Sequence, residues 1–582
     1  MRMTRSLFLL TLPALLVAQQ PPIMGVNEIR PGMKGTGRTV FQGGKIDKFT
    51  FEVMGVQRNA GPGHSIIWVK TAGGPLAETG VLQGMSGSPC YIDGKLIGAI
   101  ALAPTFGKDT LGGVTPIGEM LDQLKDIPDT PSLRTPLLLP KLEPPKVLKA
   151  ALKGEMVPLA TLLGGLEEET FKAPLPLVGT TLGAEARSFW QGTPVHFLSA
   201  PTLSHTAGME ASPLEPGGMM SISLLQGDMD MAASGTITYV NGKRLMGFGH
   251  PLMGLGAVDL PLWSASVLAS VPVLSNSYKL SVPVAPVGAL RLDRNAGVAG
   301  TLGAEARMIP LRVGLNLGGK RTFNYKFEIM DHPLLAPVLA ATVVSQVLTT
   351  QVRGAGFQSL ALQGNVKLAN HQPIQVEHMV ADVSSNRTAT FVGGLMQAIL
   401  MNPFERPVVE GASFTIKAEE RLDLTQLAGV RLLKHRAKRG EVLPVVVTLQ
   451  DIQGVRETAT LNVPIPSSAR KGPATLLVGD GLSLLATDPD ERKVETTSLA
   501  DVVKILNNAL RNNHAYALVV QNQAGAGLLG SRLEGIPPTI SGLLGADGDS
   551  QGNGLTRRVV GRAVLPLERE VRGLLSLELE IE

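Results

Sequence analysis

The chain has 582 residues, far more than one hydrophobic core usually supports, so several domains are expected. Apolar residues make up 44% and aromatic residues only 4%, and with 66 glycines and 41 prolines this composition favours turn-rich β structure over long helical bundles. The formal net charge of +4 is too slight to indicate a nucleic-acid partner, and a single cysteine excludes an intrachain disulfide.

The first 18 residues, MRMTRSLFLLTLPALLVA, have the pattern of a secretory signal peptide. Arg2 and Arg5 precede an apolar run from Leu7 to Val17, and Ala18 stands just before the polar QQPP. We therefore expect cleavage near Ala18 and an exported protein, either periplasmic or extracellular at the cell envelope. An uncleaved membrane anchor is the alternative, although the run is shorter than the roughly 20 residues of a membrane span.

Residues 22–125 predict strands and turns that end in a helix. Thr115 is the expected N-cap of that helix, and Pro116 occupies its first position. Residues 127–148 contain six prolines and predict an extended connector, so a domain boundary is expected there. The apolar segment 333–349 contains Pro, Ser and Thr and predicts a buried helix, so we expect no transmembrane span in the mature chain.

The segment GMSGSPCYIDGKLIGAI, residues 84–100, predicts a tight bend followed by a β-hairpin with an Asp-Gly turn. Gly84, Gly87 and Pro89 surround Ser86 and permit a bend that turns backbone N–H groups outward. A serine in such a bend can attack a carbonyl while the N–H groups of Gly84 and Ser86 hold the developing oxyanion. A glycine-serine turn without chemistry is the alternative interpretation.

A serine hydroxyl needs a base, and His250 is the candidate among the nine histidines. It ends the segment ITYVNGKRLMGFGHPL, whose predicted hairpin resembles the one that follows Ser86. Two related hairpins, one with a serine and one with a histidine, would suit two barrel-like halves that face each other across a cleft. A strand-end histidine satisfied by backbone groups is the alternative interpretation.

These segments resemble the SpoIVB-type serine peptidases, the stage IV sporulation protein B family. The resemblance rests on GMSGSP with PLAETGVLQ before it, on the GKLIGAI hairpin and on the GFGHP turn, within about residues 25–125 and 230–315. It implies a fold related to the two-barrel chymotrypsin-like proteases. It also implies Ser86, rather than Ser88, as the nucleophile, and His250 as the general base.

The sequence departs from the family pattern in two respects. Ser86 precedes His250 by 164 residues, whereas the family has the histidine first, so the two halves have a permuted order. The family's acidic residue lies shortly before the serine, but the matching stretch VKTAGG, residues 69–74, has no carboxylate. Asp259 is the best substitute for it, while Asp93 is expected to be a turn residue. We find no PDZ-like module.

The predicted fold class is mainly β, with a chymotrypsin-like two-barrel peptidase region followed by a β-sandwich and α+β segments. The predicted divisions are a signal peptide (1–18), a serine-bearing β half with a C-terminal helix (19–126), a proline-rich connector (127–174), a histidine-bearing β half (175–330), an α+β region (331–410), a β-sandwich-like domain (411–480) and a C-terminal α+β segment (481–582).

The leading functional hypothesis is a serine endopeptidase that acts on protein or peptide substrates in the cell envelope. Ser86, His250 and Asp259 would carry the reaction, and neither a metal nor an organic cofactor is needed. An envelope protein partner could dock on the C-terminal β domains. The alternative is a catalytically inactive, peptidase-like scaffold or protein-binding module, which the missing carboxylate favours and the presence of both Ser86 and His250 disfavours.

Overall fold

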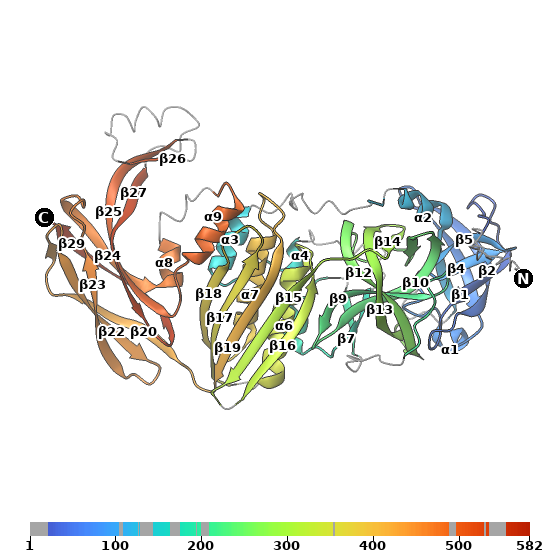
Figure 1. Cartoon of the computed structure of the whole chain (residues 1–582), viewed down its shortest axis with the longest axis horizontal. Coiled ribbons are helices and arrows are strands. Elements are labelled where there is room, and N and C mark those ends of the chain that lie inside the picture. Colours follow the sequence, from blue (N-terminus) through green and yellow to red (C-terminus); the bar gives the residue numbers. More distant parts are fainter. Residues whose placement is uncertain are drawn as a thin grey trace, which may run out of the picture.

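The computed structural model shows an elongated, mainly β protein, with the N-terminal β domain at one end and the C-terminal β domain at the other (Figure 1). The predicted signal peptide and most of the predicted connector lie outside the described residues. The structure describes residues 21–103, 109–125, 127–128, 144–162, 175–193, 195–199, 209–319, 321–352, 356–487, 496–528, 531–534 and 554–582.

The first six strands form a closed barrel, called the first barrel below. Its strand order is β1-β2-β3-β6-β5-β4, and along β2 every second side chain points inward, as expected for a half-buried strand. The short helix α1 (Leu76–Thr79) precedes the serine segment, and α2 (Ile117–Leu124) follows the last strand. The strands are β1 (Lys34–Thr39), β2 (Asp47–Gly61), β3 (His64–Ala72), β4 (Pro89–Ile92), β5 (Lys95–Leu102) and β6 (Leu111–Pro116).

A second ring of six strands, called the second barrel, lies next to the first within a 13-stranded sheet. Strand β9 pairs with both β12 and β10, and this double pairing closes the path β9-β12-β13-β14-β11-β10. The predicted two-barrel arrangement is therefore present. The strands are β9 (Met219–Gly227), β10 (Met231–Asn241), β11 (Arg244–Gly247), β12 (Gly256–Val271), β13 (Tyr278–Arg294) and β14 (Gly297–Leu302).

Apolar packing joins the two barrels. Helix α2 buries Ile117 and Met120 in a cluster that also contains Leu96 of the first barrel and Tyr239 and Leu292 of the second. Because burial of apolar surface is the main favourable term in such contacts, this cluster fixes the relative position of the barrels. The barrels therefore behave as one packed unit around the segments that carry Ser86 and His250.

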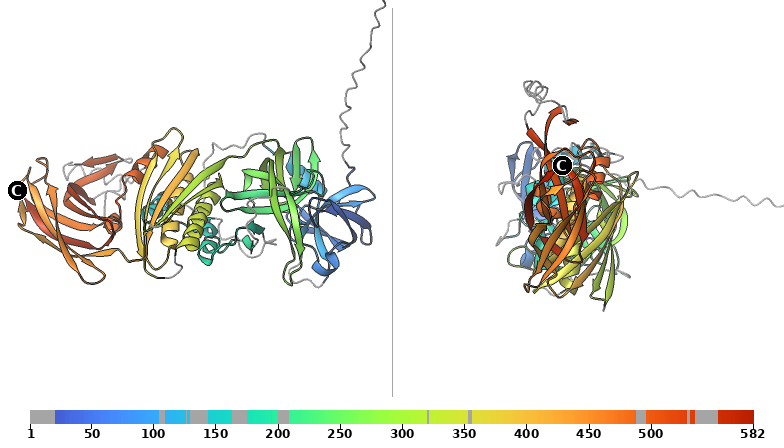
Figure 2. Two further views of the ribbon diagram at one scale, coloured as in Figure 1. Left: turned by 60° about the horizontal axis from the view of Figure 1, so that its bottom comes forward. Right: turned by 90° about the vertical axis from the view of Figure 1, so that its left-hand side faces the viewer.

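The large sheet continues from the second barrel into a middle region of strands and helices. Helices α6 and α7 lie against one face of its strands (Figure 2), and α6 is buried along most of its length. In the described part of the chain no helix is long and apolar enough to cross a membrane. The middle region consists of β15 (Met308–Leu317), β16 (Thr322–Met330), α6 (Leu335–Gln351), β17 (Gln358–Leu368), β18 (Ile374–Asp382), α7 (Asn386–Leu400) and β19 (Val409–Glu419).

Shorter elements flank this sheet and its helices. Strands β7 and β8 form its end beyond β10, and the N-cap Ser498 of α9 accepts a hydrogen bond from the N–H of Asp501, as the sequence predicts for a cap at this position. The elements are α3 (Pro144–Leu152), α4 (Leu159–Leu162), β7 (Leu175–Gly179), α5 (Ala184–Ser188), β8 (Val195–Ser199) and α9 (Leu499–Asn507).

The C-terminal domain is a sandwich of a four-stranded and a six-stranded sheet around one apolar core. Strand β19, which the sequence places in this sandwich, lies instead in the large sheet, because its alternate residues Ala412, Phe414 and Ile416 face the core of the middle region. The domain consists of β20 (Leu424–Leu432), β21 (Arg436–Ala437), β22 (Val442–Asp451), β23 (Arg456–Pro464), β24 (Gly472–Asp480), α8 (Gly481–Thr487), β25 (His514–Leu528), β26 (Ser531–Glu534), β27 (Gly554–Pro566), β28 (Glu570–Arg572) and β29 (Leu574–Ile581).

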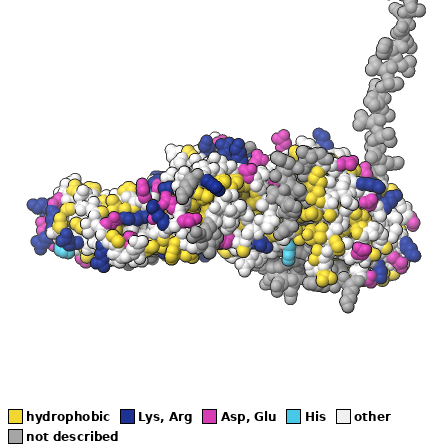
Figure 3. Space-filling view, turned by 90° about the horizontal axis from the view of Figure 1, so that it is seen from below, with side chains coloured by type: hydrophobic (Ala, Val, Ile, Leu, Met, Phe, Trp, Pro, Cys, Tyr) yellow, Lys and Arg dark blue, Asp and Glu magenta, His cyan; other side chains and the backbone are white. Residues whose placement is uncertain are grey.

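The strands after residue 513 belong to this sandwich, so the chain segment that the sequence assigns to a separate α+β part contributes to the same core. Basic side chains gather at this end of the molecule on the face shown in Figure 3. In the described part of this domain, basic side chains also pair with acidic ones, for example Lys434 with Glu441 and Arg436 with Glu582.

Candidate active site

The serine loop, residues 83–88, connects α1 to β4 and packs directly on the backbone of the second barrel. The N–H of Thr236 donates to the carbonyl of Ser86 (2.7 Å), and the hydroxyl of Thr238 donates to the carbonyl of Gly87 (2.7 Å). Gly87 has a φ of +94°, and a Cβ there would lie 1.9 Å from the carbonyl oxygen of Thr236. Only glycine satisfies both the backbone angle and the close approach.

This packing brings Ser86 and His250 together across 164 residues of sequence. The Oγ of Ser86 lies 2.8 Å from the Nε2 of His250, within the range of a nucleophile and its base. Both side chains are partly exposed, so a substrate can approach them. The long-range contact that the sequence analysis requires is present.

The second ring nitrogen of His250 hydrogen-bonds to a backbone carbonyl. Nδ1 lies 2.8 Å from the carbonyl oxygen of Pro251, and because that oxygen can only accept, Nδ1 carries the proton. Nε2 of the neutral ring is then free to accept the hydroxyl proton of Ser86. Burial lowers the pKa of His250 below its usual value of 6.5, which keeps the ring neutral at pH 7.

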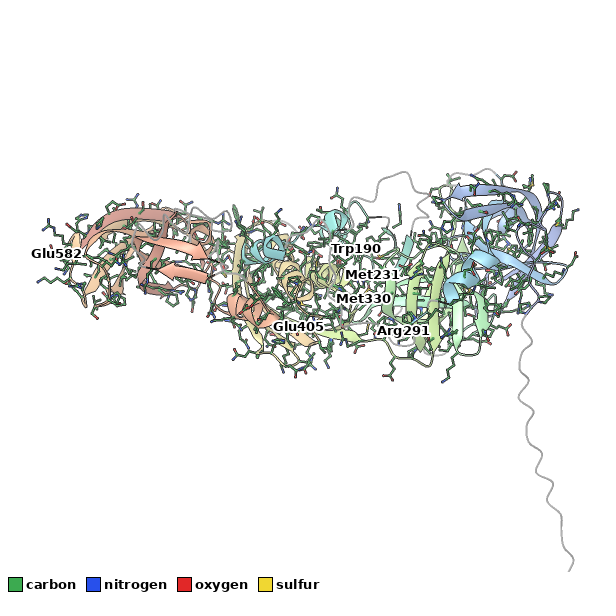
Figure 4. All side chains as sticks on the ribbon, turned by 90° about the horizontal axis from the view of Figure 1, so that it is seen from above. Trp190, Met231, Arg291, Met330, Glu405 and Glu582 are labelled. Carbon is green, nitrogen blue, oxygen red and sulfur yellow. The ribbon has the colours of Figure 1, made fainter. Side chains whose placement is uncertain are left out.

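Asp259 does not contact His250, so its predicted role as the orienting carboxylate is wrong. Its carboxylate pairs with the guanidinium of Arg291 inside the second barrel, and it also accepts from the N–H of Arg307 (3.5 Å). A buried carboxylate needs such partners, and Arg291 lies on the neighbouring strand β13 (Figure 4). Proximity to His250 in sequence therefore does not correspond to proximity in space.

Asp259 begins a chain of hydrogen bonds and ion pairs that leads from the second barrel into the middle region. Arg307 donates to Asp331, and Asp331 also pairs with Arg406 (2.9 Å). All the carboxylates in this chain are buried. The chain joins the end of the second barrel to the residues that precede α6 and β19.

Asp293 is the acidic residue that supports the histidine segment, and sequence reasoning missed it. Its fully buried carboxylate accepts hydrogen bonds from the N–H groups of Leu252 (2.7 Å), Met253 (2.9 Å) and Leu255 (3.0 Å). These bonds hold the backbone directly after Pro251, whose carbonyl binds His250. In the sequence RLDRNAG this aspartate has the appearance of an ordinary turn residue, and no local signal distinguishes it.

The peptide planes of the serine loop direct two N–H groups outward. The carbonyl of Gln83 accepts from the N–H of Lys279 (2.9 Å), and the carbonyl of Met85 accepts from the N–H of Ser88 (2.8 Å). Because the C=O and N–H of a trans peptide point in opposite directions, the N–H groups of Gly84 and Ser86 point away from these partners. Neither N–H donates to any other group in the described part of the chain. Both N–H groups are therefore available for the oxyanion role that the sequence predicts, and that role stays a prediction.

Comparison with known families supports this assignment of the serine segment. Residues 14–115 match the SpoIVB peptidase S55 family, which confirms the family resemblance drawn from the sequence. The matched segment includes Ser86 and the whole first barrel up to its last strand, but not His250, so the permuted order stays a prediction. Neither a search of curated proteins nor a search of solved structures found a match. Among the described residues no cluster of three or more His, Cys, Asp or Glu side chains could hold a metal ion.

Gly87→Ala tests whether the backbone contact at Thr236 fixes the site. We expect a loss of about 2 kcal/mol or more in the free energy of unfolding, because the new Cβ must push the loop away from β10 at a strained φ. Urea unfolding measures this difference. Gly118→Ala is the matched control, since nothing lies within 4 Å of its Cβ position in α2. Equal stability of the two variants would contradict the assignment.

Proposed function

We propose that the protein is an exported serine peptidase of the SpoIVB type that cleaves protein substrates in the cell envelope. The observation that carries the proposal is the 2.8 Å hydrogen bond between Ser86 and His250 beside two outward N–H groups. The family match of the serine segment supports the same class of enzyme. The pattern of the first 18 residues supports export.

In the proposed reaction, Nε2 of His250 takes the proton of the Ser86 hydroxyl while Oγ attacks the scissile carbonyl carbon. The negative charge that develops on the carbonyl oxygen is held by the N–H groups of Gly84 and Ser86. The imidazolium then gives its proton to the leaving amine, and an acyl-enzyme remains. A water molecule, activated by the same imidazole, releases the acid product and restores the serine.

His250 would carry out this proton transfer without a carboxylate on its Nδ1. The Pro251 carbonyl fixes the tautomer and the ring orientation, which are two of the functions of the triad carboxylate. As a neutral acceptor it stabilises the imidazolium less than a carboxylate would. We therefore expect a slower peptidase than one with a complete Ser-His-Asp triad.

The second candidate function is a scaffold that retains the peptidase fold without turnover. The absence of a carboxylate at His250 in the described structure favours it. In either case the C-terminal sandwich and the first barrel lie at opposite ends of the molecule (Figure 1), so the sandwich would dock a protein substrate or an envelope partner rather than take part in the chemistry.

A fluorophosphonate probe distinguishes the two candidates, because it phosphonylates only an activated serine. We expect the wild-type protein to be labelled and labelling to disappear in Ser86→Ala and in His250→Ala, as read by in-gel fluorescence and by mass spectrometry of the modified peptide. Ser65→Ala and His64→Ala, on the first barrel away from the loop, should retain labelling. A folded wild-type protein that is not labelled would favour the scaffold.

Asp293→Asn tests the support of the histidine segment. An amide keeps one oxygen acceptor and replaces the other with an N–H donor, so at least one of the three backbone N–H groups loses its acceptor, the backbone around Pro251 shifts and the labelling rate should fall about 100-fold. The rate is measured by quenching the labelling reaction at a series of times. Asp259→Asn removes a carboxylate buried in the same barrel and should lower stability while leaving the rate of folded protein unchanged. Equal rates in the two variants would argue against Asp293 as a positioning residue.

The pH dependence of labelling should report the lowered pKa of His250. Only the neutral ring can accept the serine proton, so on the acidic side the rate should rise with pH, with a midpoint below 6.5. The second-order labelling rate between pH 4 and 7 measures this midpoint. His64→Ala should leave the midpoint of the pH dependence unchanged, because His64 pairs with Glu119 beside the first barrel. A midpoint at or above 6.5 would refute the buried-base assignment.

A further inference from the structure

A lysine is buried directly behind the serine loop. Lys279 lies near the start of β13, its side chain is almost completely inaccessible, and its Nζ donates to the hydroxyl of Thr39 (2.7 Å). In the described part of the chain it forms no ion pair. Asp47, which is opposite Thr39 in the β1–β2 pairing, is the charged group that acts on it from a greater distance.

The side chain and the backbone of Lys279 both contact the oxyanion segment. Its alkyl chain passes Gly84 so closely that a Cβ on this glycine would lie 3.3 Å from Cβ and Cδ of the lysine. Its N–H donates to Gln83, the bond that turns the N–H of Gly84 outward. The amino group therefore lies on the inner side of the loop, opposite the side where an oxyanion would form.

A chain of hydroxyl groups connects the amino group to the loop. The hydroxyl of Ser88 donates to Thr39 (2.9 Å) and lies 3.4 Å from the hydroxyl of Thr236, which donates to the carbonyl of Gly84 (2.9 Å). Ser88, Thr39 and Thr236 are fully buried. These three hydroxyl groups thus connect Lys279 to Gly84, whose N–H is a proposed oxyanion donor.

A buried amine without an adjacent carboxylate is costly to the folded state, because the charged form loses its hydration. Burial lowers the pKa of Lys279 to about 7. A methionine would fill the same volume without this unfavourable free energy of burial. Packing alone therefore does not explain a lysine at this position. In a low-dielectric setting, however, its charge acts strongly on a nearby developing anion.

We propose that Lys279 is a positioning residue of the oxyanion site, which fixes the serine loop through the Thr39–Ser88–Thr236 hydroxyl chain and adds positive potential behind the N–H groups of Gly84 and Ser86. This inference rests on the proposed peptidase function. Lys279 touches neither Ser86 nor the substrate position, so it acts through the loop. Of the groups packed around it, Thr39, Met219 and Gly84 are uncharged, and Asp47 supplies the one ionic influence.

Lys279→Met tests the proposal because it keeps the length of the side chain and removes the charge. With a fluorophosphonate probe we expect the maximal inactivation rate to fall about 10- to 100-fold, somewhat less than for loss of an oxyanion donor itself, while the probe's half-saturation concentration is unchanged. The wild-type rate should decline as pH rises through about 7, and this decline should be absent in the variant. Lys45→Met, at an exposed position of the first barrel, is the matched control.

Stability provides an independent measurement. Loss of an uncompensated buried amine should leave the melting temperature unchanged or raise it, so a variant that melts earlier would overturn the proposal. Thr39→Val removes the hydroxyl oxygen that accepts the hydrogen bond from Nζ of Lys279. It should give the same fall in inactivation rate as Lys279→Met. An unchanged rate in Lys279→Met, or a rise in the half-saturation concentration alone, would also overturn the proposal. Failure of wild-type labelling would refute the peptidase function instead.

Discussion

The close approach of two backbones, the serine loop and strand β10, determines whether there is a site at all. The N–H of Thr236 donates to the carbonyl of Ser86, and Gly87 has no side chain that would keep the loop away from β10. Because the imidazole comes from the same barrel as Thr236, the position of the hydroxyl relative to the base is set by this contact rather than by the loop alone. The apolar cluster around α2 also packs the first barrel against the second.

Three of the four buried charged residues in the second barrel have different tasks, and the fourth is Arg291. Asp259 is neutralised by Arg291 and connects the barrel to the middle region. Asp293 has no ionic partner among the described residues and holds backbone N–H groups beside Pro251. Lys279 also lacks an ion pair there and faces the serine loop. The two groups without counter-ions bond to the segments that carry His250 and Ser86, and perturbed buried groups of this kind are frequent at functional sites.

The sequence predicted what local chemistry determines. The hairpin after Ser86, the cap at Ser498, the buried helix α6 and the need for a distant histidine all follow from short patterns. Closure of the second barrel depends on the pairing of β9 with two partners, and β19 joins β15 and β17 rather than the sandwich that follows it. Such pairings depend on which apolar core buries the inward-facing side chains of each strand. The alternation of apolar and polar residues in the sequence cannot specify that core. Asp293 could not be recognised for the same reason, because its partners are backbone groups about 40 residues earlier.

The order of the barrels also governs when Ser86 acquires its hydrogen-bond partner His250. A polypeptide is synthesised from its N-terminus, so the residues of all six strands of the first barrel, and Ser86, are made before the segments that carry His250 and Asp293. Until the second barrel packs against residues 83–88, the hydroxyl of Ser86 lacks its hydrogen bond to His250. Under the proposed function, this order would delay the reactivity of Ser86 until both barrels have been made and have assembled.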